Sequence, residues 1–174
     1  MDGLNLYIPG QGLESAGDPG EGREEPGLSF IMFSLQGETF AVPLSQVKEI
    51  IRVPHITWMP GAHAAVRGII NLRGTVVAVL ELAALLGHPA VECDQRSRIV
   101  IAESGETEAG LLVEEVMGVE TVTYAAMEQS MRTLDPGQRG IITAQAEVSG
   151  RLAGILDVDA IVERSRPAAD FNRL

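Results

Sequence analysis

The chain contains an internal repeat, and this repeat limits the folds that it can adopt. Apolar segments of the first half recur in the same order in the second half. Residues 30–33 match residues 99–102, and residues 67–70 match residues 139–142. Each copy has about five short apolar runs bounded by turn residues, which is too few strands for an open sheet with a protected core. We therefore predict a mainly β protein of two five-stranded barrels side by side, with short helices.

The most distinctive part of the first copy is a predicted β-hairpin over residues 67–82. Runs rich in Ile and Val flank the sequence Asn-Leu-Arg-Gly at residues 71–74. Gly74 can take the positive φ that a tight turn requires, so Arg73 is expected to project from a rigid turn. The second copy has no arginine at this turn. That difference favours a specific role for Arg73, whose planar guanidinium pairs bidentately with carboxylates, over a solvated turn arginine.

Composition divides the chain into three regions. Residues 1–27 are rich in Gly, Pro, Glu and Asp and are predicted to be a disordered tail. An apolar cluster at residues 4–8 could dock on the domain or on a partner, but we take it as part of the idle tail. Residues 28–164 form the folded domain, with a first β unit at about 28–92 and a second at about 93–164, whose strands can exchange between barrels. Residues 165–174 form a C-terminal tail.

Charge and apolar patterning exclude several classes of partner. The chain has 13 basic and 24 acidic side chains, for a formal net charge of −11, which argues against binding nucleic acid or an anionic membrane surface. We see no signal peptide, and no apolar run approaches the length of a membrane-spanning helix. The single cysteine, Cys93, cannot form an internal disulfide. We expect a soluble, cytoplasmic protein with no direct membrane insertion.

Local patterns predict several shorter features. Pro43 begins a short helix, because apolar residues follow at spacings of three and four up to Ile51. A second short helix is predicted at residues 81–86. Residues 127–139 form a long loop, and Asp157 caps a helix that follows it in the chain. Trp58 is expected to pack in the core.

The sequence offers little that points to catalysis. Its three histidines are scattered, no Gly-rich phosphate loop is present, and no serine sits in a nucleophile elbow. The carboxylate pairs Glu114–Glu115 and Asp157–Asp159 are interpreted as solvated. We expect no enzymatic activity, no metal and no cofactor, and we favour a binding module. An enzyme or ligand-binding barrel that uses these carboxylates is the alternative, and it requires a defined pocket.

Residues 68–74, followed by the apolar run at 76–82, resemble the signature of the CheW family of bacterial chemotaxis coupling proteins. Segments at residues 30–35, 40–50 and 110–116 agree with the family and come in its order. The resemblance covers about residues 28–164. The chain departs from the family at Glu81, where an aspartate is usual.

This resemblance implies two SH3-like five-stranded barrels related by an internal pseudo-twofold. It also implies a non-enzymatic scaffold that couples the cytoplasmic tips of methyl-accepting chemoreceptors to the regulatory domain of the CheA histidine kinase. Such a protein lies in the cytoplasm and reaches membrane-associated receptor arrays through its partners. The alternative within the family is an adaptor of a non-flagellar chemosensory pathway, such as type IV pilus control.

The resemblance also implies which residues meet the receptor. Arg73 is the receptor-contacting arginine, Val47 and Glu49 lie near its face, and Asn71 belongs to the same receptor-binding set. Gly68 and Gly74 are the turn-forming glycines. Kinase contacts are expected from apolar surface at the barrel ends.

Overall fold

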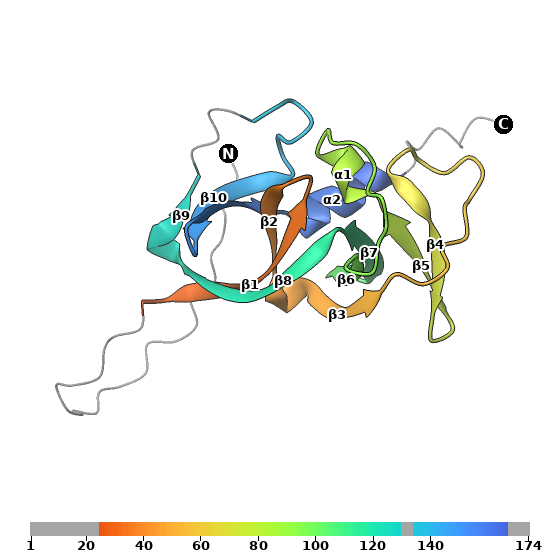
Figure 1. The fold of residues 1–174 in the computed structure, drawn as a ribbon, viewed down its shortest axis with the longest axis horizontal. Helices are drawn as coiled ribbons and strands as arrows, with labels where there is room; N and C mark the ends of the chain where they lie inside the picture. Colours follow the sequence, from red (N-terminus) through yellow and green to blue (C-terminus); the bar gives the residue numbers. More distant parts are fainter. Residues whose placement is uncertain (1–24, 130–133, 167–174) are drawn as a thin grey trace.

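Two β-sheets account for most of the structure, a computed structural model that describes residues 25–129 and 134–166 (Figure 1). The prediction of a mainly β protein with short helices is confirmed. The predicted tails lie outside the described residues over residues 1–24 and 167–174. The first strand, β1 (Gly27–Leu35), begins one residue before the predicted start of the domain, and the last helix, α2 (Val158–Ser165), ends one residue after its predicted end.

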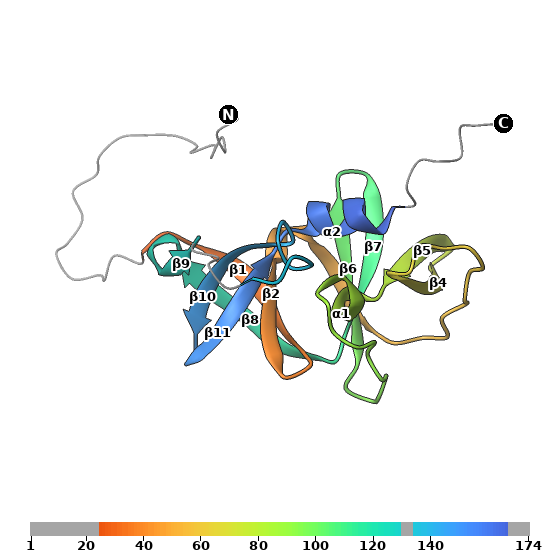
Figure 2. The ribbon, with the colours of Figure 1, turned by 90° about the horizontal axis from the view of Figure 1, so that it is seen from above.

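The six-stranded sheet has the order β8 (Glu115–Thr123), β1, β2 (Glu38–Pro43), β11 (Arg151–Leu156), β10 (Ile142–Val148) and β9 (Met127–Glu128). Its two edge strands, β8 and β9, are joined directly by the 3₁₀ helix η2 (Tyr124–Ala126). The sheet therefore curls round on itself, as Figures 1 and 2 show, which is consistent with a barrel.

The five-stranded sheet has the order β3 (Val47–Arg52), β6 (Arg98–Ser104), β7 (Thr107–Val113), β5 (Thr75–Leu80) and β4 (Val66–Leu72). The 3₁₀ helix η1 (Leu44–Gln46) precedes β3, and the short helix α1 (Leu82–Leu85) follows β5. In Figure 2 helix α2 lies across the junction between the two sheets.

The sequence repeat corresponds to a repeat of elements. Each half contains a hairpin, an edge strand, a second hairpin and a short helix. Each sheet joins the first hairpin of one half to the second hairpin of the other, through the parallel pairs β2–β11 and β5–β7. The edge strands cross over in the same way, because β8 pairs with β1 and β3 pairs with β6. Both sheets thus contain strands from both halves of the chain.

The core is mainly aliphatic, as the low aromatic content requires. One large cluster of buried residues links the two sheets with both α-helices. A smaller group, which we call the alanine-rich cluster, is formed by strands of the six-stranded sheet. It consists of Phe30, Met32, Ala41, Val122, Ala144, Ala146, Ala153 and Ile155.

The predicted helix after Pro43 is wrong beyond its first turn. Only Leu44–Gln46 is helical, as a 3₁₀ turn, and the chain continues as strand β3. Pairing with β6 overrides the helical spacing of the apolar residues, and burial along β3 alternates with the two-residue period of a strand. The predicted long loop at residues 127–139 is interrupted by the short strand β9, and residues 130–133 lie outside the described residues.

The predicted cap of the last helix is confirmed. Asp157 precedes α2, and its Oδ1 accepts a hydrogen bond from the N–H of Ala160 at 3.0 Å. We expect Asp157→Ala to lower the free energy of unfolding by about 1 kcal/mol, because the substitution leaves a helix N–H without this acceptor. Chemical denaturation of both proteins measures the change. An equal free energy of unfolding would show that the cap contributes nothing.

Candidate functional site

The β4–β5 hairpin presents Arg73 from a two-residue turn. Arg73 and Gly74 both have left-handed backbones, with φ of +51° and +86°, and Leu72 pairs with Thr75 across the turn. These values are typical of the type I′ turn that matches the twist of a hairpin. Asn71 supports the turn, because its Oδ1 accepts the N–H of Gly74 at 2.8 Å. The turn is thus fixed by its own sequence.

The predicted turn role of Gly68 is wrong, since this residue lies inside strand β4. Its neighbourhood explains the glycine instead. A Cβ at this position would lie 2.4 Å from the backbone oxygen of Thr57. Thr57 pairs with Ile69 through two backbone hydrogen bonds of 2.8 Å, which fasten the loop at residues 53–65 to the edge of β4. Gly68 therefore permits a close approach of two backbones.

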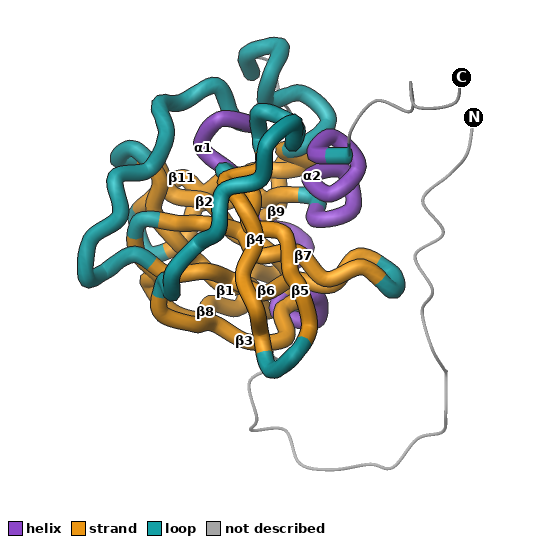
Figure 3. The backbone as a smooth tube through the Cα atoms, turned by 90° about the vertical axis from the view of Figure 1, so that its right-hand side faces the viewer, coloured by secondary structure: helices purple, strands orange, loops and turns teal. Residues whose placement is uncertain are grey.

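Arg73 forms a bidentate ion pair with Glu49 of strand β3. Its Nη1 and Nη2 donate to the two carboxylate oxygens of Glu49 at 2.6 and 2.8 Å. β3 and β4 are the two edges of the five-stranded sheet, so this pair connects the edges where the hairpin extends beyond the sheet (Figure 3). The hydrogen bonds from Arg73 to Glu49, followed by the charge of Glu49, raise the pKa of Arg73 above its ordinary value.

The Arg73 side chain keeps most of its surface in solvent despite this pair. It is 73% exposed, whereas the side chain of Glu49 is 20% exposed. A guanidinium has five N–H donors in a fixed fork, and Glu49 takes two of them. The remaining donors can meet an acceptor of a second molecule while Glu49 holds the side chain in place.

Val47 and Glu49 both lie on strand β3, with a register shift against β6 between them. Val47 is partly buried and packs against the main core. Lys48, between them, is exposed, and its ammonium pairs with Glu103 of β6 and with Glu108 of β7. The structure thus brings Arg73, Glu49 and Asn71 together, with Val47 beside them along β3.

The surface next to this group is apolar. A groove of about 370 Å³ is lined by Pro54, His55, Thr57, Ile69, Ile70, Asn71 and Val76. The side chain of Val76 is largely exposed. The prediction that Trp58 packs in the core is wrong, because Trp58 is 72% exposed. Its neighbour Thr57 is tied to the edge of β4, and the Trp58 indole lies in solvent. A charged group beside apolar surface is typical of a protein–protein interface.

A buried polar cluster at the other end of the hairpin was missed by the sequence reasoning. Glu81 is 4% exposed and its Oε2 accepts from Nη1 of Arg67 at 2.6 Å. Its Oε1 accepts the N–H of Val91 at 3.0 Å, and Arg67 also donates to the Val91 carbonyl at 3.3 Å. The internal repeat contained a signal for this cluster, because Glu81 aligns with Asp157, the residue that caps α2. The longer glutamate reaches a different partner.

The members of the predicted carboxylate pairs have separate surroundings, and Glu114 lines a cavity of about 450 Å³ with Glu92 and Asp94. Glu114 accepts the backbone N–H of Gln36 at 3.0 Å, and Asp157 caps α2. Within residues 25–129 and 134–166, no three His, Cys, Asp or Glu side chains are grouped as metal ligands would be. Over the same residues, no helix has both the length and the apolar character needed to cross a membrane.

Comparison with known proteins agrees with this geometry. A family model described as CheW-like domain matches residues 29–166. The chemotaxis protein CheW of Bacillus subtilis is 30% identical over 138 residues, which cover 79% of this chain and 88% of that protein. Protein PilI of Pseudomonas aeruginosa is 30% identical over 121 residues, covering 70% of this chain and 68% of PilI.

The fold has a solved counterpart. The crystal structure of the scaffolding protein TtCheW from Thermoanaerobacter tengcongensis matches with a TM-score of 0.70 and 24% sequence identity. The match covers 81% of this chain and 91% of TtCheW. At this identity the match shows the fold alone, whereas the family model spans most of the chain. The chain therefore belongs to the CheW-like domain family.

Proposed function

We propose that this protein is a non-enzymatic adaptor that couples methyl-accepting chemoreceptors to a CheA-type histidine kinase. The exposed Arg73 guanidinium, held by its turn and by Glu49, carries this proposal. It lies in the Asn-Leu-Arg-Gly element on which the family resemblance rests, and a fixed arginine beside apolar surface suits recognition of another protein. The names of the CheW relatives support the coupling role.

In this proposal the receptor-binding face comprises Arg73, Glu49, Asn71 and Val47, and it meets the cytoplasmic tip of the receptor. The kinase regulatory domain binds elsewhere, through apolar surface. The folded domain over residues 28–164 carries both contacts, and residues 1–27 and 165–174 are tails. The protein works in the cytoplasm, at receptor arrays that it reaches through its partners, and it needs no cofactor.

A second pathway is favoured by one observation. PilI is as similar in identity as the Bacillus subtilis CheW, at 30%. An adaptor of a non-flagellar chemosensory system, such as type IV pilus control, is therefore the alternative within the same proposal. The receptor and kinase encoded beside this protein's gene distinguish the two pathways.

Co-sedimentation tests the coupling role. The purified protein is mixed with a receptor cytoplasmic fragment, with the CheA-type kinase, and with both, and the pellets are compared. We expect the protein to join each partner and the kinase to pellet with the receptor more completely when the adaptor is present. Failure to join either partner would reject the coupling role for that pathway.

A further inference from the structure

Strand β8 has one open edge. It is nine residues long, and among the described residues it pairs only with β1, with a register shift at Met117. Two apolar side chains on it, Met117 and Val119, are 41% and 53% exposed. An open strand edge with exposed apolar side chains is a template for a further strand.

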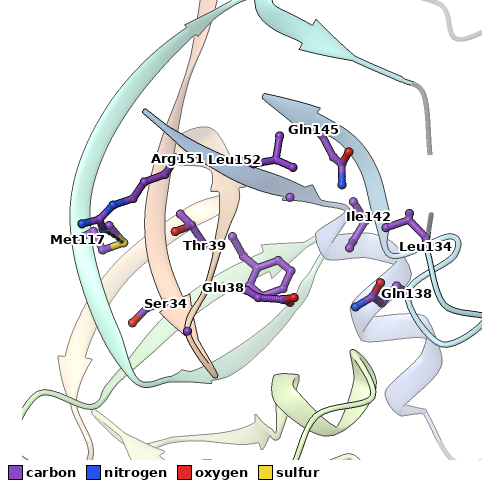
Figure 4. A pocket seen from close by; sticks show the side chains of 13 residues that line it. Ser34, Glu38, Thr39, Met117, Leu134, Gln138, Ile142, Gln145, Arg151 and Leu152 are labelled. Atoms are coloured by element: carbon purple, nitrogen blue, oxygen red, sulfur yellow. Dashed lines mark hydrogen bonds between the residues drawn. The ribbon is translucent and has the colours of Figure 1, made fainter. Parts of the chain in front are cut away.

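A gap separates this edge from the β10–β11 hairpin. A cavity of about 260 Å³ is lined by Met32, Thr39, Met117, Glu120, Val148, Ser149 and Arg151. Met32 belongs to the alanine-rich cluster, so the gap leads from the surface toward the interior of the six-stranded sheet. A larger cavity of about 630 Å³ adjoins it and shares Thr39, Met117 and Arg151. In Figure 4 Arg151 reaches across to Met117, with Nη1 3.9 Å from Sδ.

The pairing of β9 explains why the gap exists. This strand has two residues, and it pairs with Gln145 and Ala146 of β10. Val148, at the end of β10, lies beyond that pairing and lines the cavity. The six-stranded sheet is thus continuous where η2 joins β8 to β9, and it is open beside residues 117–120 of β8.

The N-terminal segment has the pattern of a short strand. Residues 4–8 read Leu-Asn-Leu-Tyr-Ile, so Leu4, Leu6 and Ile8 alternate with Asn5 and Tyr7, and Pro9 follows. The segment carries no charge, so it would not set a like charge against Glu120 at the edge of the gap. It differs from the acidic, Gly- and Pro-rich stretch at residues 9–24 that joins it to the domain.

The attachment point and the length of this linker suit the open edge. The carbonyl of Pro26 accepts the N–H of Tyr124 at 3.1 Å, and Gly27 pairs with Thr123, so the chain enters the fold beside the end of β8. The centre of the open edge, at residues 117–119, precedes Thr123 by four to six residues along β8. At about 3.3 Å per residue it lies about 13–20 Å from Thr123. A chain of 16 residues, the length of 9–24, has a root-mean-square span of about 20–24 Å by the statistics of linkers.

We propose that residues 4–8 add to the open edge of β8 as a further strand of the six-stranded sheet. Backbone hydrogen bonds to β8 hold the segment, and Leu4, Leu6 and Ile8 fill the gap next to Met117 and Val148. A second copy of the chain paired edge to edge, or a strand of another protein, would use the same edge. The linker favours the chain's own segment, because it supplies an effective concentration of about 1 mM.

Amide hydrogen exchange on the full chain tests the proposal. Leu6→Asp puts a charge into the added strand, and Leu13→Asp makes the same change in the linker as a matched control. For a segment whose Kd without the tether is about 0.1 mM, an effective concentration of about 1 mM keeps the edge covered about ten times as often as open. Amide exchange at the edge is then slowed about tenfold. We expect the outward amides of β8 to exchange about tenfold faster in Leu6→Asp than in the wild type and in Leu13→Asp. The amides bonded to β1 should stay unchanged in all three.

Three results would overturn the proposal. Equal exchange in the wild type and in Leu6→Asp would show that residues 4–8 do not cover β8. Protection that rises with protein concentration would identify a second copy as the occupant. Protection that arises only when receptor or kinase is added would identify a partner's strand. Each result is independent of the coupling role, which the co-sedimentation measures separately.

Discussion

Arg73→Glu is expected to weaken binding to the receptor fragment by about tenfold or more while leaving the fold intact. The substitution replaces an exposed cation by an anion, and it sets this anion against both Glu49 and any carboxylate of the receptor. Titration of the receptor fragment by calorimetry gives the dissociation constant, and a melting curve reports the fold. Kinase binding should change less than receptor binding.

The second hairpin offers a matched control. Ser149 and Gly150 occupy the β10–β11 turn with φ of +51° and +74°, almost the values of Arg73 and Gly74. Ser149→Glu therefore introduces a carboxylate at the corresponding turn of the other sheet. Receptor affinity in this variant should match the wild type. An equal loss in both variants would assign the effect to net charge and remove Arg73 from the receptor site.

A charge swap separates recognition from support. Arg73 could act by touching the receptor or by joining the sheet edges through Glu49, and the single variant disrupts both. The double variant Glu49→Arg/Arg73→Glu restores an ion pair between the same positions with the charges exchanged. If Arg73 contacts the receptor directly, we expect affinity to stay low in the double variant while the melting temperature recovers. Recovery of receptor affinity would show that the pair serves only to hold the hairpin.

The sequence was most informative where local chemistry decides the structure. The hairpin turn followed from Gly74 and its flanking Ile and Val runs, and the cap of α2 followed from Asp157. Both depend on residues within four positions of each other, so the pattern contains the relevant contacts. The repeat extended this reach, because it located the second pair of hairpins from the first.

Predictions from the sequence were wrong or incomplete where contact with a distant segment decides the structure. Residues after Pro43 have helical spacing, but the neighbouring strand β6 makes them a strand. Gly68 resembled a turn glycine, yet its role comes from the approach of Thr57. The Arg73–Glu49 pair joins opposite edges of one sheet, and 24 residues separate its partners in the chain. The resemblance to the CheW family placed Arg73 and Glu49 near one face, whereas their spacing in the sequence could not predict this contact.

Glu81→Leu is expected to lower the free energy of unfolding by about 2–3 kcal/mol. The buried carboxylate accepts from Arg67 and from the Val91 N–H, and leucine accepts from neither. The Val91 N–H loses its acceptor, and the Arg67 guanidinium keeps only its hydrogen bond to the Val91 carbonyl. The melting temperature should fall by about 4–12 °C for a domain of this size, against a smaller fall for Asp157→Ala at the matching position.

A double variant distinguishes the lost ion pair from lost packing. Arg67→Met removes the other charge, so Arg67→Met/Glu81→Leu replaces the pair by apolar side chains. We expect it to recover part of the loss, because the uncompensated guanidinium is gone, although the Val91 N–H still lacks its acceptor. If the loss in the double variant equals the sum of the losses in the two single variants, the two side chains are not coupled.

The two ion pairs of the hairpin should therefore separate in function. Arg67 and Glu81 lie at its base, near the start of β4 and the end of β5, whereas Arg73 and Glu49 lie at its tip. The base pair has a buried carboxylate and fastens the hairpin to the segment around Val91, whereas the tip pair presents an exposed guanidinium. Measured well below the melting temperature, receptor affinity in Glu81→Leu should fall much less than in Arg73→Glu. An equal fall would mean that the position of the whole hairpin, rather than the charge at its tip, determines receptor binding.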